Sequence, residues 1–106
     1  MGEQSAAFVA ATICELAAGD FDRVSKEAVE HTERHAPLVP GLIEAAVLEG
    51  DGKTQLLILS QWESRDAWAR AQWDEEVGRV VADLAQSGSS FDVRTFVPIA
   101  IIRPAR

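Results

Sequence analysis

The chain has 106 residues, of which 47% are apolar and 25% are charged, and this predicts one globular domain over residues 1–106 with disorder only at residues 1–6. Its formal net charge of -7 argues against nucleic acid as a partner, because that binding depends on a positive surface. There is neither an apolar run long enough to cross a membrane nor a signal-peptide pattern, so we expect a soluble cytoplasmic protein with no membrane partner.

The first half of the chain predicts a strand followed by a helix. Residues 8–16 are apolar and partly β-branched, which is typical of a strand. Cys14 lies inside this pattern and, as the single cysteine, excludes an internal disulfide; we interpret it as a small buried hydrophobe. Asp20 is a candidate N-cap for a helix that Pro37 ends at about residues 35–36.

The second half predicts a hairpin, helical segments and a last strand. Residues 42–50 and 54–62 are two apolar runs that a glycine-rich turn separates. Ser64 is a candidate cap for a short helix, and residues 74–84 carry an apolar stripe at helical spacing after Asp74. Residues 91–103 form a last, long strand.

The order β-α-β-β-α-β predicts an α+β, ferredoxin-like fold, with a four-stranded antiparallel sheet and both helices on one face. Pro98 cannot donate a ladder hydrogen bond, so the last strand lies at an edge there or is broken by a bulge. Consecutive apolar residues in the third and last strands indicate that both sheet faces are covered. Because the helices cover only one, we expect a homodimer in which the tail strands reach across.

All three tryptophans lie in the segment QWESRDAWARAQW, where the third strand passes into the short helix. Strand alternation places Trp62 on one face with Ile58 and Ser60. If that face meets the helices, Trp68 can converge on Trp62 and line a cavity for a flat apolar ligand; plain core packing is an equally good interpretation. Trp73 is five residues from Trp68, so on one helix the two side chains point in different directions, and we interpret Trp73 as a packing residue outside the cavity.

Several polar side chains are candidates for acid–base or anion-binding roles. His31 and His35 have a spacing that can bind a metal, but no third ligand is evident, so an exposed pair is the better interpretation and either imidazole could be a general base. Two arginines after Trp62 could hold a phenolate oxygen, although surface ion pairs are the simpler role: Arg70 and Arg79. Three carboxylates beside apolar strand positions would suit proton abstraction if buried: Glu15, Glu44 and Glu63.

The sequence lacks a glycine-rich phosphate loop, a G-x-S-x-G turn and a spaced Cys/His cluster. We therefore expect no cofactor and no metal.

Two segments, Val39-Pro40-Gly41-Leu42 and Gln61-Trp62-Glu63-Ser64, set in this order of elements, resemble the antibiotic biosynthesis monooxygenase superfamily of dimeric α+β barrels. The chain most resembles those members that oxidise anthrone or naphthol rings of aromatic polyketides to quinones without a cofactor. The resemblance implies a homodimer whose substrates are an aromatic molecule and dioxygen. It also implies a pocket lined by Trp62 and Trp68, with Arg79 as the nearest counterpart of the family's arginine.

The chain departs from this family pattern at two polar positions. Ile58 stands where the quinone-forming enzymes have an asparagine, and Leu48 matches a pocket histidine on the preceding strand. Ile58 and Leu48 would then keep the pocket dry beside Ser60, and His35 is the residue that could replace the missing base.

Other activities stay open. The alternatives are a polyketide cyclase or isomerase and a non-catalytic dimeric module that binds a flat hydrophobic metabolite. Haem degradation is less well supported, because Thr12 and Val81 occupy about the places where that branch has an asparagine and a histidine.

Overall fold

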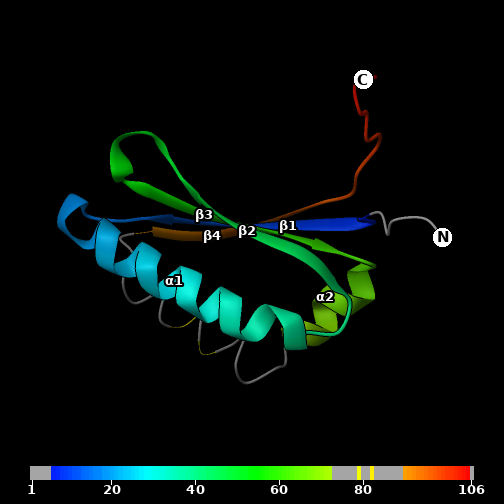
Figure 1. Cartoon of the computed structure of the whole chain (residues 1–106), viewed down its shortest axis with the longest axis horizontal. Coiled ribbons are helices and arrows are strands. Elements are labelled where there is room, and N and C mark those ends of the chain that lie inside the picture. The colour runs from blue at the N-terminus through cyan, green and yellow to red at the C-terminus, as the bar shows by residue number, and fades with distance from the viewer. Residues whose placement is uncertain (1–5, 73–78, 80–81, 83–89, 106) are drawn as a thin grey trace.

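The structure is a computed structural model that describes residues 6–72, 79, 82 and 90–105. It contains one four-stranded antiparallel sheet in the order β2-β3-β1-β4 (Figure 1). The strands are β1 (Phe8–Glu15), β2 (Leu42–Glu49), β3 (Gln55–Trp62) and β4 (Ser90–Phe96). The helices α1 (Phe21–His35) and α2 (Arg65–Ala71) lie on one face of this sheet. The predicted ferredoxin-like α+β fold is confirmed.

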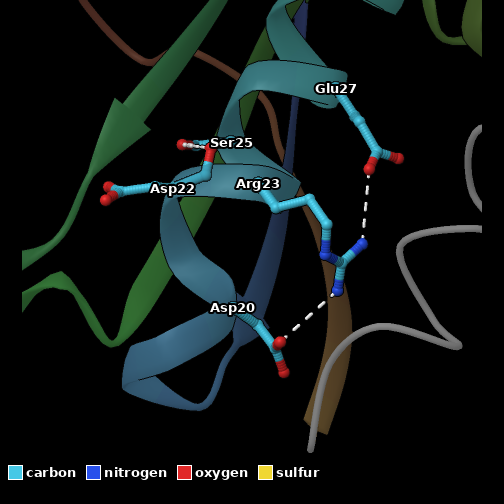
Figure 2. Close-up of polar contacts among 5 residues, drawn as sticks. All are labelled: Asp20, Asp22, Arg23, Ser25 and Glu27. Atoms are coloured by element: carbon cyan, nitrogen blue, oxygen red, sulfur yellow. Dashed lines mark hydrogen bonds and ion pairs between the residues drawn. The ribbon is translucent and has the colours of Figure 1, made fainter.

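The start of α1 differs from the prediction. Asp20 occupies the predicted N-cap position of α1, but it belongs to a short 3-10 turn (Ala18–Asp20) and its side chain makes no capping hydrogen bond. Its carboxylate instead lies 3.5 Å from Arg23, whose guanidinium also lies 3.3 Å from Glu27 (Figure 2). In the same close-up, Ser25 Oγ donates to the Asp22 carbonyl at 3.2 Å. These contacts are exposed and contribute little to stability.

The apolar side of α1 packs on the sheet through residues at helical spacing. Phe21, Val24 and Ala28 form one core cluster with Cys14, Leu16 and Leu56. Cys14 is 1% exposed, which confirms its prediction as a buried hydrophobe, and this burial raises the pKa of the thiol.

The hairpin between β2 and β3 forms where it was predicted. It turns through Asp51–Lys53, with Gly52 at a φ of 79° that favours glycine. β2 has a bulge between Leu42 and Glu44, which shifts its side-chain alternation by one residue.

The predicted cap of α2 is confirmed, since Ser64 Oγ accepts a hydrogen bond from the Ala67 N–H at 3.0 Å.

The last strand is shorter than predicted. β4 ends at Phe96, two residues before Pro98, and residues 97–105 leave the sheet on the side away from the helices (Figure 1). Pro98 has no N–H to donate, and the described chain offers these residues no partner strand.

Some predictions fall outside the described residues. They concern disorder at 1–5, the packing of Trp73, the cap at Asp74 and most of the stripe at 74–84, of which only residues 79 and 82 are described, both as helical. Within the described ranges, we find no helix with the length and apolar character that crossing a membrane requires.

Candidate functional site

Strand pairing determines which side chains meet the helices. Trp62 pairs with Phe8 on β1 and with Leu42 on β2, and cross-strand partners share a face of the sheet. Phe8 and Trp62 pack with Ala67 and Ala71 of α2, so this is the helix-facing side. Alternation adds Ser60 and Ile58 to the same side. The prediction that these β3 side chains share a face is confirmed, and the face is the one toward the helices.

Trp62 is held by a short chain of polar contacts. The side chain is 5% exposed, and its Nε1–H donates to Ser60 Oγ at 2.8 Å. Ser60 Oγ in turn donates to the Ala10 carbonyl at 3.4 Å. Because an indole has a single N–H, this bond leaves Trp62 no donor for a ligand. Its ring can still form an apolar wall.

Phe8 and Trp68 form an aromatic pair in the same cluster as Trp62. Trp68 is partly buried against the Trp62 cluster, and its ring centroid lies 5.3 Å from that of Phe8 at an interplanar angle of 43°. The Arg65 guanidinium carbon lies 5.8 Å from the Phe8 centroid, within the range of a cation–π contact. Trp68 thus joins the cluster that contains Trp62, and its ring contact is with Phe8.

Phe8 and Arg65 were missed from the sequence. Phe8 joins the cluster only through the pairing of β1 with β3, which residue spacing does not reveal. Arg65 had one local signal, because it follows the capping Ser64 directly and thus lies at the first turn of α2.

The two segments that carried the family resemblance lie against each other. The Glu63 N–H donates to the Gly41 carbonyl at 2.9 Å. Gly41 has a φ of 83°, and a Cβ there would collide with the Ala67 Cβ. The glycine therefore lets the chain pass close to α2, which positions Val39 and Leu42 against the aromatic cluster.

The histidines extend the buried side of α1. His31 and His35 continue the spacing of Phe21, Val24 and Ala28, and their rings stack with centroids 5.7 Å apart and 24° between planes. Both are half-buried, so the interpretation as an exposed pair is wrong. His31 Nδ1 is buried and has no hydrogen-bond partner among the described residues.

The remaining predicted site residues are exposed. Leu48 pairs with Leu57 and therefore lies on the sheet face opposite the helices, where it is 42% exposed, so the structure does not bring it to Ile58 and Trp62. Arg79 and Arg70 are exposed. The carboxylates proposed as buried bases are also exposed, which contradicts that hypothesis: Glu15, Glu44 and Glu63.

No group of three His, Cys, Asp or Glu side chains that could hold a metal ion occurs among the residues that the structure describes.

No protein-family model matches the sequence, and no curated protein matches it. Solved structures do match closely in shape. A monooxygenase from the gene ActVA-Orf6 of Streptomyces coelicolor, in complex with the ligand nanaomycin D, has a TM-score of 0.82 and 19% identity over 94% of both chains. A candidate antibiotic biosynthesis monooxygenase from Deinococcus radiodurans has a TM-score of 0.78 and 12% identity over 93% of this chain and 99% of that one. Rv0793 from Mycobacterium tuberculosis has a TM-score of 0.74 and 12% identity over 91% and 99%.

These similarities extend over nearly the whole length of each chain. The protein has the fold of the antibiotic biosynthesis monooxygenase structures, and the resemblance noted in the sequence is confirmed at the level of the fold.

Proposed function

We propose that the protein is a cofactor-independent monooxygenase that oxidises an aromatic polyketide of the anthrone or naphthol type to a quinone. The observation that carries this proposal is the cluster of Phe8, Trp62 and Trp68 at the junction of β3 and α2. Flat apolar rings bind well against such side chains, because aromatic surfaces stack and bury a large area. The fold shared with monooxygenase structures supports the choice of reaction.

The chemistry sets clear requirements. Dioxygen is a triplet and reacts slowly with closed-shell molecules, so the substrate must first lose a proton to become an electron-rich enolate or phenolate. This anion transfers one electron to dioxygen, and the two radicals combine in a new carbon–oxygen bond. The resulting peroxide loses water and leaves the quinone carbonyl, so one oxygen atom enters the product and the other leaves as water. The protein must position the ring, stabilise the anion and exclude bulk water.

The candidate residues divide between these tasks. Trp62 forms a fixed wall because Ser60 holds its ring, and the partly buried Trp68 provides a second stacking surface. Ile58 lies on the same sheet face and packs against the α1 core cluster, so it keeps the neighbouring space apolar. His35 takes the substrate proton, and Arg79 stabilises the anion.

A homodimer completes the proposal. Apolar side chains on the described C-terminal segment are strongly exposed, among them Val97 at 67%, Ile99 at 102% and Ile102 at 87%. Leu48 and Phe96, at 42% and 52%, lie on the sheet face opposite the helices. A second copy packed on that face, with the tails exchanged, would bury this apolar surface and strengthen a small domain.

A binding module without catalysis is the second candidate. It is favoured by the bond between Trp62 and Ser60, which occupies the polar group of the tryptophan, and by Ile58 in place of a polar side chain. A cyclase or isomerase would bind its substrate against the same aromatic cluster and would not need dioxygen.

Oxygen uptake tests the proposal. The metal-free protein is given an anthrone or a dihydroxynaphthalene, with an anaerobic control and with three variants: Trp68→Leu, Trp62→Phe and His35→Ala. We expect quinone formation above the uncatalysed rate, reduced at least about tenfold in each variant. Val29→Ala, on the outer side of α1 and 40% exposed, is the control and keeps the rate. Ligand binding without oxygen uptake would move the protein to the second candidate.

A further inference from the structure

One buried polar atom on the inner side of α1 lacks a partner. His31 Nδ1 is shielded from solvent and accepts or donates no hydrogen bond among the described residues. Buried polar groups are nearly always paired, because leaving one unpaired costs free energy. A buried nitrogen without a protein partner is a place where a ligand atom or a bound water can complete the hydrogen bond.

The sheet beneath α1 does not satisfy this nitrogen. α1 contacts β2 and β3, whose helix-facing residues are mostly apolar and include Val47, Leu56 and Ile58. The Ser60 hydroxyl on this face is engaged with Trp62 and Ala10.

Titratable groups are sparse around His31. Within the described parts of the sheet, those on the helix-facing side are Cys14, buried in the cluster with Phe21, and Glu49, an exposed carboxylate opposite Leu56. On α1 itself, His35 stacks on the His31 ring, while Glu27, Glu30 and Arg34 are exposed.

We propose that His31 is the residue that recognises a ring hydroxyl of the aromatic ligand, through a hydrogen bond at its buried Nδ1. A hydroxyl is the matching group because it can donate to an unprotonated Nδ1 or accept from an Nδ1–H, so either tautomer is satisfied. This inference rests on the proposed function, and it adds a specificity-determining residue on α1 to a site otherwise built from β1, β3 and α2. The site would reject an aromatic ring without the hydroxyl, because Nδ1 would then stay unpaired.

A pair of ligands and a pair of variants test the inference. Binding of 1-naphthol and of 1-methylnaphthalene is measured by calorimetry without dioxygen; the two have rings of the same shape, and only the first has a hydroxyl. We expect wild-type protein to prefer 1-naphthol at least about fivefold, the factor that one neutral hydrogen bond provides. His31→Phe, which keeps a flat ring, reduces that preference to about one. Thr32→Val, one residue along α1 and also half-buried in the wild type, is the matched control and keeps the preference.

A spectroscopic measurement on wild-type protein covers the case in which His31→Phe fails to fold. With two histidines in the chain, the imidazole ¹⁵N resonances are few, and we expect His31 Nδ1 to shift on addition of 1-naphthol and to stay in place with 1-methylnaphthalene. An unchanged preference in His31→Phe, an equal loss in Thr32→Val, or no ¹⁵N shift would overturn the inference. A hydroxyl preference that depends on His31, in a protein that takes up no oxygen, would support the inference while refuting the monooxygenase proposal.

Discussion

Replacement of Ser60 by alanine tests how Trp62 is held. In the folded protein the Trp62 Nε1–H donates to Ser60 Oγ at 2.8 Å, and the tryptophan is 5% exposed. In Ser60→Ala the indole N–H stays buried and loses its acceptor, which costs about 1–3 kcal/mol. The second bond of the hydroxyl, to the Ala10 carbonyl at 3.4 Å, is long and adds little. We therefore expect a loss of about 2 kcal/mol, which lowers the melting temperature by about 8–16 °C in a domain of this size.

Urea denaturation followed by far-UV circular dichroism measures this loss. Protein concentration is held constant, because the stability of a dimer depends on it. Ser25→Ala is the matched control: its hydroxyl donates to the Asp22 carbonyl at the exposed start of α1, so we expect a change within about 0.5 kcal/mol. In the Trp62→Phe background the N–H is absent, and Ser60→Ala then becomes nearly neutral, with a coupling energy of about 1–2 kcal/mol. An equal loss in both backgrounds would refute the view that Ser60 acts by holding Trp62.

Three further substitutions follow from the described contacts. Gly41→Ala lowers the free energy of unfolding by at least about 2 kcal/mol in urea denaturation, because it adds a collision with α2 to the strain of a positive φ. Gly52→Ala is also at positive φ but in open space, and it lowers the free energy of unfolding by about 1 kcal/mol. Equal losses would contradict the close approach of Gly41 to α2. Burial raises the pKa of the Cys14 thiol above 9.0, so the folded state holds the thiol proton more tightly than the unfolded chain does. The free energy of unfolding therefore falls as pH rises past about 9, and it falls less in Cys14→Ala. Identical pH profiles of the two proteins would refute this. The double variant Ile99→Ser, Ile102→Ser shifts the sedimentation coefficient from that of the proposed dimer toward that of a monomer, without loss of the circular dichroism signal. An unchanged dimer would exclude these side chains from the dimer interface.

Local chemistry was enough to predict most elements. The Ser64 cap, the breaks around Gly41 and Gly50, and the spacing of Val24 and Ala28 each act within a few residues, and the structure has them where they were expected. Asp20 failed as a cap because the chain enters α1 through a 3-10 turn, which leaves this residue in a helical conformation. A capping residue needs an extended backbone, and its type alone does not guarantee one.

The candidate site depends on longer-range geometry. Alternation within β3 put Ile58, Ser60 and Trp62 together, but it could not tell which layer they face. In β2, strict alternation from Leu42 would bring Leu48 to the helix side, and the bulge after Leu42 reverses this phase. Sequence spacing does not reveal such a bulge. The resemblance therefore predicted Leu48 in the pocket, whereas Leu48 lies on the opposite face of the sheet.

The overlong last strand has a different explanation. Residues 97–103 keep a strand-like apolar pattern, yet β4 ends at Phe96. The segment that follows departs from the sheet, and its side chains are mostly exposed (Figure 1). A strand forms only when its backbone has a partner, and the described chain supplies none here. In the proposed dimer the sheet of the second copy would supply that partner, and Ile99 and Ile102 would be buried rather than exposed. The apolar pattern would then encode an intermolecular strand, which a single chain can specify in its sequence but cannot form alone.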